Sequence, residues 1–101
     1  MSAFDPQGVE GDGTGKVKVV AAGTPQPITA SGFIVKAFTV QSDPANAGTY
    51  FYVKDMNGYI MGKIQKGQSF TPPQLPAAGV DLSRIQIDAD TTGDGCYVSY
   101  V

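Results

Sequence analysis

This 101-residue chain lacks most of the residues that enzymes use for chemistry. Histidine does not occur, so the commonest acid–base group at neutral pH and the commonest metal ligand are both missing. The single cysteine, Cys96, has no histidine to activate it and no second cysteine for a disulfide. We therefore expect a protein that is not an enzyme and that has no catalytic residue, cofactor or metal, with Cys96 as a buried structural thiol.

Charge is also scarce, because only 16 % of the residues are charged, against about a quarter in an average domain. The formal net charge is −2, and the lysines are scattered singly or in pairs. Nucleic-acid binding needs clustered positive charge that displaces counterions, so no nucleic-acid partner is expected. A surface with few ionic groups loses little hydration when it packs against another protein. The low charge therefore suits a protein that adheres to others.

Long apolar runs and a charged-then-apolar leader are absent as well. No membrane partner and no cleaved signal are therefore expected. A single cysteine is compatible with assembly in a reducing cytoplasm. The length fits one domain with a thin core.

The first fifteen residues differ in composition from the rest, since they contain several glycines, one proline and three acids but no base. Such a segment has too little apolar surface to offset the entropy lost on ordering. We expect a flexible N-terminal arm over residues 1–15 and a single β-domain over residues 16–101. The arm is either a plain disordered terminus or a segment that orders on a neighbouring subunit, with Phe4 and Val9 as its anchors.

From residue 16 onwards, short apolar or alternating segments are separated by turn-forming residues. The strand over 33–40 is apolar on both faces and is expected to be central, and Asn57-Gly58 predicts a type I′ hairpin turn. No segment has a helical period. The fold class is therefore all-β: a small β-sandwich or barrel of seven to eight short antiparallel strands with a flexible N-terminal arm. The expected strands cover residues 16–19, 33–40, 49–54, 59–64, 68–70, 82–89 and 96–101.

Tyrosines on the expected strands are the first candidates for a functional surface. Tyr50 and Tyr52 point one way on their strand, while Phe51 and Val53 point the other way. Exposed tyrosines can stack on sugars or bases, or anchor a protein interface, but cross-strand packing explains such residues equally well. The remaining tyrosines on expected strands are Tyr59, Tyr97 and Tyr100.

Two other motifs have both a functional and an ordinary interpretation. One is a group of three acids, Asp88, Asp90 and Asp94, which could supply oxygen ligands for Ca²⁺. Their spacing is not that of an EF-hand, and an ordinary solvated hairpin loop rich in acids explains them too.

The other lies in residues 71–78, which contain three prolines and are therefore predicted to form an extended crossing outside the sheets. The stretch 73–76 formally matches the PxxP motif of SH3 ligands, but the crossing accounts for it.

Over residues 16–101, the order of motifs resembles that of small virion proteins of tailed bacteriophages. The phrase Asp-Pro-Ala-Asn-Ala-Gly leads into a tyrosine-containing strand over residues 43–55. A Gly-Gln-Ser step at 67–69, a proline-containing crossing, an Asp-Leu-Ser segment at 81–88 and a Gly-Asp-Gly turn follow in the same order. The chain departs from this pattern at Phe51 and at the hairpin over 56–58.

The resemblance implies a capsid decoration or cement protein, which would form a homotrimer on the surface of the virion. Its partner would be the major capsid protein, and assembly would take place in the cytoplasm of the bacterial host. A tail, baseplate or head–tail connector component is an alternative, and a carbohydrate-binding or receptor-binding β-module is an alternative of another class. The candidate interface residues are Phe4, Val9, Tyr50, Tyr52, Phe70, Pro72, Pro73 and Leu75.

Overall fold

The computed structural model describes residues 13–72 and 78–101. The candidate interface residues Phe4, Val9, Pro73 and Leu75 lie outside the described residues, as does the PxxP stretch. The strands are β1 (Gly13–Lys18), β2 (Gln26–Pro27), β3 (Ile34–Val35), β4 (Phe38–Ser42), β5 (Tyr50–Lys54), β6 (Ile60–Gln65), β7 (Ser69–Phe70), β8 (Val80–Asp81), β9 (Gln86–Ala89) and β10 (Gly95–Tyr100), with a 3₁₀ turn, η1, over Leu82–Arg84.

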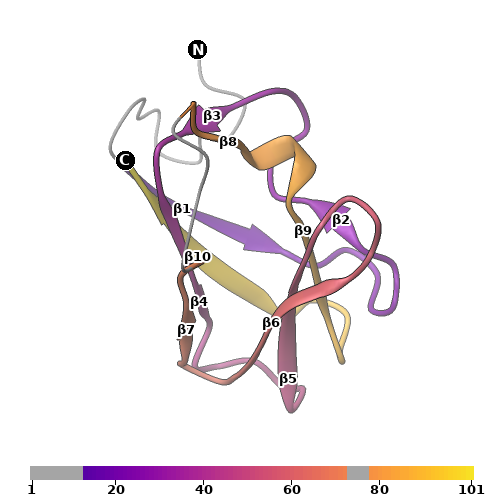
Figure 1. Cartoon of the computed structure of the whole chain (residues 1–101). Coiled ribbons are helices and arrows are strands. Elements are labelled where there is room, and N and C mark those ends of the chain that lie inside the picture. The colour runs from indigo at the N-terminus through magenta and orange to yellow at the C-terminus, as the bar shows by residue number, and fades with distance from the viewer. Residues whose placement is uncertain (1–12, 73–77) are drawn as a thin grey trace.

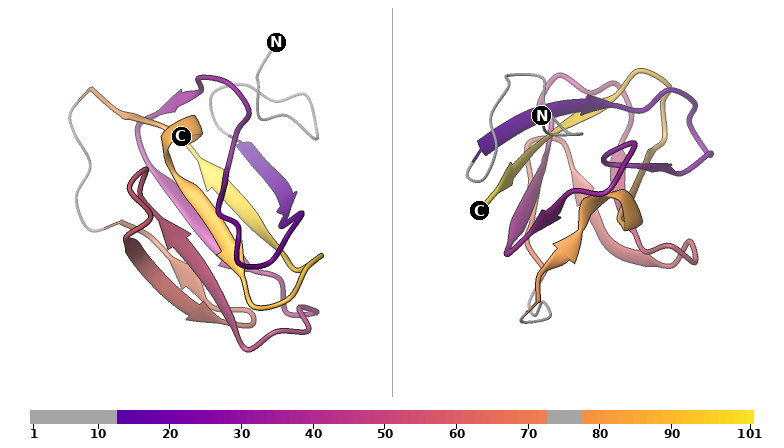
Figure 2. Two further views of the ribbon diagram at one scale, coloured as in Figure 1. Left: turned by 90° about the vertical axis from the view of Figure 1, so that its right-hand side faces the viewer. Right: turned by 90° about the horizontal axis from the view of Figure 1, so that it is seen from above.

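Two four-stranded antiparallel sheets make up the body of the domain (Figure 1). Sheet A has the order β1-β10-β4-β7, and sheet B has the order β2-β9-β5-β6. The short pair β3 and β8 lies at one end of the two layers, where β10 also ends (Figure 2 shows the arrangement from two further sides). The expected all-β sandwich is confirmed. The first strand begins at Gly13, three residues before the expected start of the β-domain.

The core lies between sheets A and B because each central strand turns alternate side chains inward. Phe38 and Val40 of β4 face the core from sheet A, and Phe51 and Val53 of β5 face it from sheet B. All four side chains are at most 2 % exposed. Burial of each such side chain favours folding by about 1.5–3 kcal/mol. The expected alternation along β5 is therefore confirmed.

The single central strand expected over residues 33–40 is wrong. The segment forms two strands in different sheets: β3 pairs with β8, whereas β4 pairs with β10 and β7. Between the two strands, Lys36 is exposed and its backbone N–H donates to the carbonyl of Val101 at 2.8 Å. The buried side chains Val35, Phe38 and Val40 come from these two successive strands, whereas Ile34 is 69 % exposed, so no single strand is covered on both sides.

The expected hairpin between β5 and β6 is present, but the expected type I′ turn is wrong. Gly58 has a φ of +85°, whereas Asn57 does not have a positive φ. The Asp55 carboxylate accepts hydrogen bonds from the backbone N–H groups of Asn57 at 2.9 Å and Tyr59 at 3.0 Å. Bonds of this kind hold the loop in an Asx-type turn, so a single glycine with positive φ suffices to reverse the chain.

Cys96 is fully buried on the inward side of β10, as expected for a structural thiol. Burial raises the pKa of the Cys96 thiol to about 12. Because the thiolate is the reactive form, the folded protein keeps this cysteine chemically inert near neutral pH.

Candidate functional site

The outer side of sheet B carries a cluster of tyrosines and charged residues, which we call the tyrosine face. Because Phe51 and Val53 of β5 point into the core, the residues between them point outward. The neighbouring strands add outward residues from both sides, since Tyr52 is paired with Lys63 of β6 and with Asp88 of β9. The tyrosine face consists of Tyr50, Tyr52, Lys54, Lys63, Asp88 and Asp90.

Lysines already cover the two aromatic rings of this face. The ring centroids of Tyr50 and Tyr52 are 6.5 Å apart, at an angle of 43°. The ammonium nitrogen of Lys63 lies 4.1 Å from the Tyr50 centroid, and that of Lys54 lies 5.6 Å from the Tyr52 centroid. These are cation–π distances. A ligand that stacks on the same side of either ring must first displace a lysine.

Asp90 fixes the position of both tyrosines. Its carboxylate accepts a hydrogen bond from the Tyr52 hydroxyl at 2.7 Å and another from the Tyr50 backbone N–H at 3.0 Å. The hydrogen bond to Asp90 raises the pKa of Tyr52 to about 12, with smaller contributions from burial and from nearby negative charge. The hydroxyl of Tyr52 is therefore a committed donor at neutral pH and not a general base.

The raised pKa of Tyr52 predicts a specific loss of stability at alkaline pH. An unfolded tyrosine titrates near pH 10, so the stabilising hydrogen bond is fully present below pH 10 and is lost as the pH rises towards about 12. We expect denaturant unfolding of the wild type to weaken across this window, and Tyr52→Phe to remove that part of the pH dependence. The exposed Tyr59 gives the control Tyr59→Phe, which should leave the alkaline profile unchanged. Identical profiles for Tyr52→Phe and wild type would contradict the assignment.

Asp88 is buried, which corrects the expectation that it is an acid of a solvated hairpin loop. Ile85, Ile87 and Ala89 of the same segment are buried, and Asp88 on the opposite side is also only 4 % exposed. Its carboxylate forms an ion pair with Lys54 at 3.3 Å and accepts the backbone N–H of Gly23 at 2.9 Å. A loop from the other end of the chain therefore covers this acid. The ion pair borders an open hollow of about 530 Å³ between β5, β9 and residues 22–23.

Asp94 is also buried, at 6 % exposure, which corrects the expectation of a solvated acidic loop. Its carboxylate accepts the backbone N–H groups of Ala47 at 2.9 Å and Gly48 at 2.8 Å. Asp88, Asp90 and Asp94 thus bind different donors and do not converge. Within residues 13–72 and 78–101, no group of three acids or thiols is placed to hold a metal ion. In the structure, the three carboxylates accept hydrogen bonds from backbone and side-chain donors of the domain.

A second candidate surface was not expected from the sequence. The loop between β5 and β6, which projects from sheet B in Figure 1, and the start of β6 expose four large apolar side chains. The exposed fractions are 56 % for Met56, 72 % for Tyr59, 55 % for Ile60 and 37 % for Met61. We call these four residues the apolar hairpin. Four large apolar side chains this exposed within residues 56–61 indicate an interaction surface more strongly than scattered single residues do.

The remaining predicted contact residues do not form one surface. Tyr50 and Tyr52 are half-buried neighbours, while Phe70 packs against the core and Pro72 is buried. The Phe70 ring approaches β6 so closely that a Cβ at Gly62 would lie 2.5 Å from it. Phe70 therefore helps to close the space between the two sheets. Of the other tyrosines, Tyr100 is buried in the core, and Tyr97 is half-buried beside Lys16.

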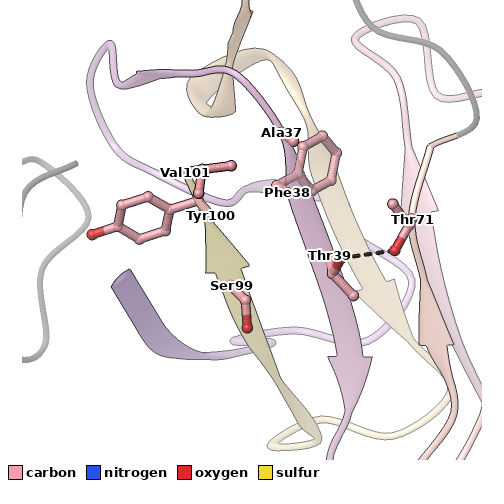
Figure 3. Close-up of a pocket in the computed structure, with 7 residues that line it drawn as sticks. All are labelled: Ala37, Phe38, Thr39, Thr71, Ser99, Tyr100 and Val101. Atoms are coloured by element: carbon pink, nitrogen blue, oxygen red, sulfur yellow. Dashed lines mark hydrogen bonds between the residues drawn. The ribbon is translucent and has the colours of Figure 1, made fainter. Parts of the chain in front are cut away.

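A smaller hollow of about 200 Å³ lies on the outer side of sheet A, near the end of β10 (Figure 3). The hydroxyl groups of Thr39 and Thr71 are hydrogen-bonded to each other there at 2.7 Å, and Ser99 lies on the adjacent strand. The described residues that line this hollow have no acidic, lysine or arginine side chain. The hollow therefore offers hydroxyl groups but no acid–base pair.

Comparison with protein-family models, with curated proteins and with solved structures finds no match for this chain. The helical content of the described ranges is limited to η1, and no helix there is long and apolar enough to cross a membrane.

Proposed function

We propose that this protein is a structural component of a phage particle, a capsid decoration or cement protein that bridges neighbouring major capsid subunits. The observation that carries the proposal is the apolar hairpin, where Tyr59 is 72 % exposed and Ile60 is 55 % exposed. An exposed apolar group on a domain with 16 % charged residues is suited to bury itself against another protein. The order of sequence motifs adds the resemblance to small virion proteins.

The chemistry of the hairpin fits attachment to a protein surface. Methionine adapts its shape to an irregular partner, and tyrosine combines a large apolar ring with a polar tip. Burial of one such side chain is favourable by about 1.5–3 kcal/mol, which is too little for stable attachment. A homotrimer would present three copies of the hairpin, and linked contacts raise the effective concentration of each one. The proposed trimer would convert modest contacts into firm attachment.

Attachment to the shell is tested with the variant Ile60→Asp. A charge at the centre of the apolar hairpin must be desolvated on binding, so we expect the affinity for undecorated shells to fall at least about tenfold, or roughly 1.4 kcal/mol. Co-sedimentation with shells of the major capsid protein and the melting temperature of the shells provide the readouts.

Val20→Asp is the matched control, because Val20 is 78 % exposed but lies in the loop after β1. This variant should bind shells as the wild type does. The proposal fails if the wild-type chain neither sediments with shells nor raises their melting temperature. Equal binding by Ile60→Asp and wild type would exclude the apolar hairpin as the contact.

A carbohydrate-binding or receptor-binding module is the second candidate, and the paired tyrosines beside the hollow of about 530 Å³ favour it. The lysines over both rings count against it, since a sugar would have to displace them. Binding of the wild type to a glycan array, abolished by Tyr50→Ala, would support this candidate. A tail, baseplate or connector role would instead be revealed by the position of the protein in a density map of the particle.

A further inference from the structure

Met56 of the apolar hairpin contacts the guanidinium group of Arg84. Lys54 of β5 is paired with Gln86 of β9, and the same antiparallel register continued by two residues places Met56 opposite Arg84. The Sδ atom of Met56 accepts a hydrogen bond from Nη1 of Arg84 at 3.6 Å. Met56 is 56 % exposed and Arg84 is exposed as well, so a small solute can reach the sulfur atom. The structure therefore holds an accessible thioether beside a permanent positive charge.

The contact between Met56 and Arg84 is weak as long as the sulfur is a thioether. Thioether sulfur is a poor hydrogen-bond acceptor, whereas a guanidinium group is a strong, charged donor. A sulfoxide carries a polar oxygen on the same sulfur atom, and this oxygen is a much better acceptor. Oxidation of Met56 would therefore replace the weak contact by a charge-assisted hydrogen bond to a neighbour that is already in place.

Hydrogen peroxide and organic peroxides can carry out this oxidation without a further reactant. A lone pair of the Met56 sulfur forms a bond to one peroxide oxygen, and the O–O bond breaks. The departing oxygen takes up the proton of the transferred oxygen and leaves as water or, from an organic peroxide, as an alcohol. Sulfur loses two electrons and the peroxide gains them. Negative charge develops on the departing oxygen, and the N–H groups of Arg84 are close enough to stabilise it.

We propose that Met56 is a site of reversible oxidation by peroxides, and that Arg84 both speeds the oxygen transfer and holds the sulfoxide oxygen by a hydrogen bond. Met61 of β6 is the internal comparison, because it is 37 % exposed and the contact with Arg84 is made by Met56. Methionine sulfoxide is returned to the thioether by methionine sulfoxide reductases, so the change can be undone. The site follows from the geometry of the chain itself and does not depend on a role in a phage particle.

The rates of oxidation test the site directly. The full chain is treated with dilute hydrogen peroxide, and peptide mapping by mass spectrometry follows Met56 and Met61 separately. We expect Met56 to react several times faster than Met61, and Arg84→Ala to lower the Met56 rate several-fold while leaving the Met61 rate unchanged. Lys66→Ala removes a positive charge from an exposed residue of the turn after β6 and should change neither rate. An unchanged Met56 rate in Arg84→Ala would overturn the proposal.

Two further measurements separate the effect of Arg84 from other causes. In chemically unfolded protein the two methionines should react at the same rate, and a preference for Met56 that persisted there would overturn the assignment to the fold. In the folded protein, oxidation of Met56 should shift the NMR signals of the Arg84 guanidinium group. Met56→Leu should abolish that shift, whereas Met61→Leu should retain it. The same shift in both variants would show that the sulfoxide at Met56 is not bonded to Arg84.

The consequence of this oxidation for attachment rests on the proposed function. A sulfoxide puts a polar group into the apolar hairpin, and this group must lose its hydration when the hairpin is buried. In Met61→Leu, where Met56 is the remaining methionine of the hairpin, we expect peroxide treatment to lower the affinity for undecorated shells several-fold. The variant that combines Met56→Leu with Met61→Leu should bind equally before and after treatment.

The outcomes for attachment and for the oxidation site can be told apart. Equal binding of shells by oxidised and unoxidised Met61→Leu would overturn the consequence for attachment. Failure of the unoxidised chain to bind shells at all would contradict the proposed function. The oxidation rates of the isolated chain would still decide whether Met56 is the modified residue.

Discussion

Replacement of Phe51 by alanine is expected to lower the free energy of unfolding by about 3–5 kcal/mol, because it removes a large buried ring from the centre of sheet B. Phe51 is 1 % exposed and is paired with Ile64 of β6 and Ala89 of β9. A domain of this size is stable by only about 5–15 kcal/mol, and each kcal/mol shifts its melting temperature by about 4–8 °C. Thermal and denaturant unfolding should both report the loss.

Tyr59→Ala is the matched control, since it removes an aromatic ring that is 72 % exposed. Its effect on the free energy of unfolding should stay within about 0.5 kcal/mol. A loss of comparable size in the two variants would mean that the ring of Phe51 is not part of a close-packed core. The comparison therefore tests the assignment of inward and outward faces along β5 and the hairpin.

Replacement of Asp94 by alanine is expected to cost about 2–4 kcal/mol, because it removes the acceptor of one buried and one part-buried backbone N–H group. Ala47 and Gly48 donate to this carboxylate, and a Cβ at Gly48 would lie 2.9 Å from one of its oxygens. Asp94→Asn retains one acceptor oxygen and should lose less. Chemical denaturation of the two variants gives the order of the losses.

Asp55→Ala provides a control with the same number of backbone hydrogen bonds. The Asp55 carboxylate also accepts from two N–H groups, but those bonds are exposed to solvent. Water can replace the lost acceptor there, so we expect a loss of at most about 1 kcal/mol. If Asp55→Ala destabilised the protein as much as Asp94→Ala does, burial would not be the reason for the importance of Asp94.

The parts of the fold that the sequence predicts are those set by neighbouring residues. Tyr50 to Lys54 alternate in burial as the sequence indicates, and the apolar residues Ile85, Ile87 and Ala89 are buried. The acids could not be placed in this way, because their partners are distant in the chain. Gly23 is 65 residues from Asp88, and Ala47 is 47 residues from Asp94. Local patterns do not contain that information.

In the candidate site, too, the features set by neighbouring residues could be predicted and those set by distant residues could not. The outward direction of Tyr50 and Tyr52 follows from the period of a strand, whereas the lysines that cover their rings come from the pairing of strands. The exposure of the apolar hairpin was not predicted, because the exposure of a residue depends on which distant segments cover it. One signal was available, since Tyr59, Ile60 and Met61 are consecutive apolar residues in the strand expected over residues 59–64, and adjacent strand residues face opposite sides.

The place of β10 in sheet A has a consequence for synthesis on the ribosome. β1 and β4 are not neighbours, because β10 lies between them and pairs with both. Residues 95–100 therefore have to emerge before the two earlier strands can acquire their ladder, and until then β1 and β4 present open edges. Sheet A is therefore completed late in synthesis, when this strand is inserted between the two earlier ones.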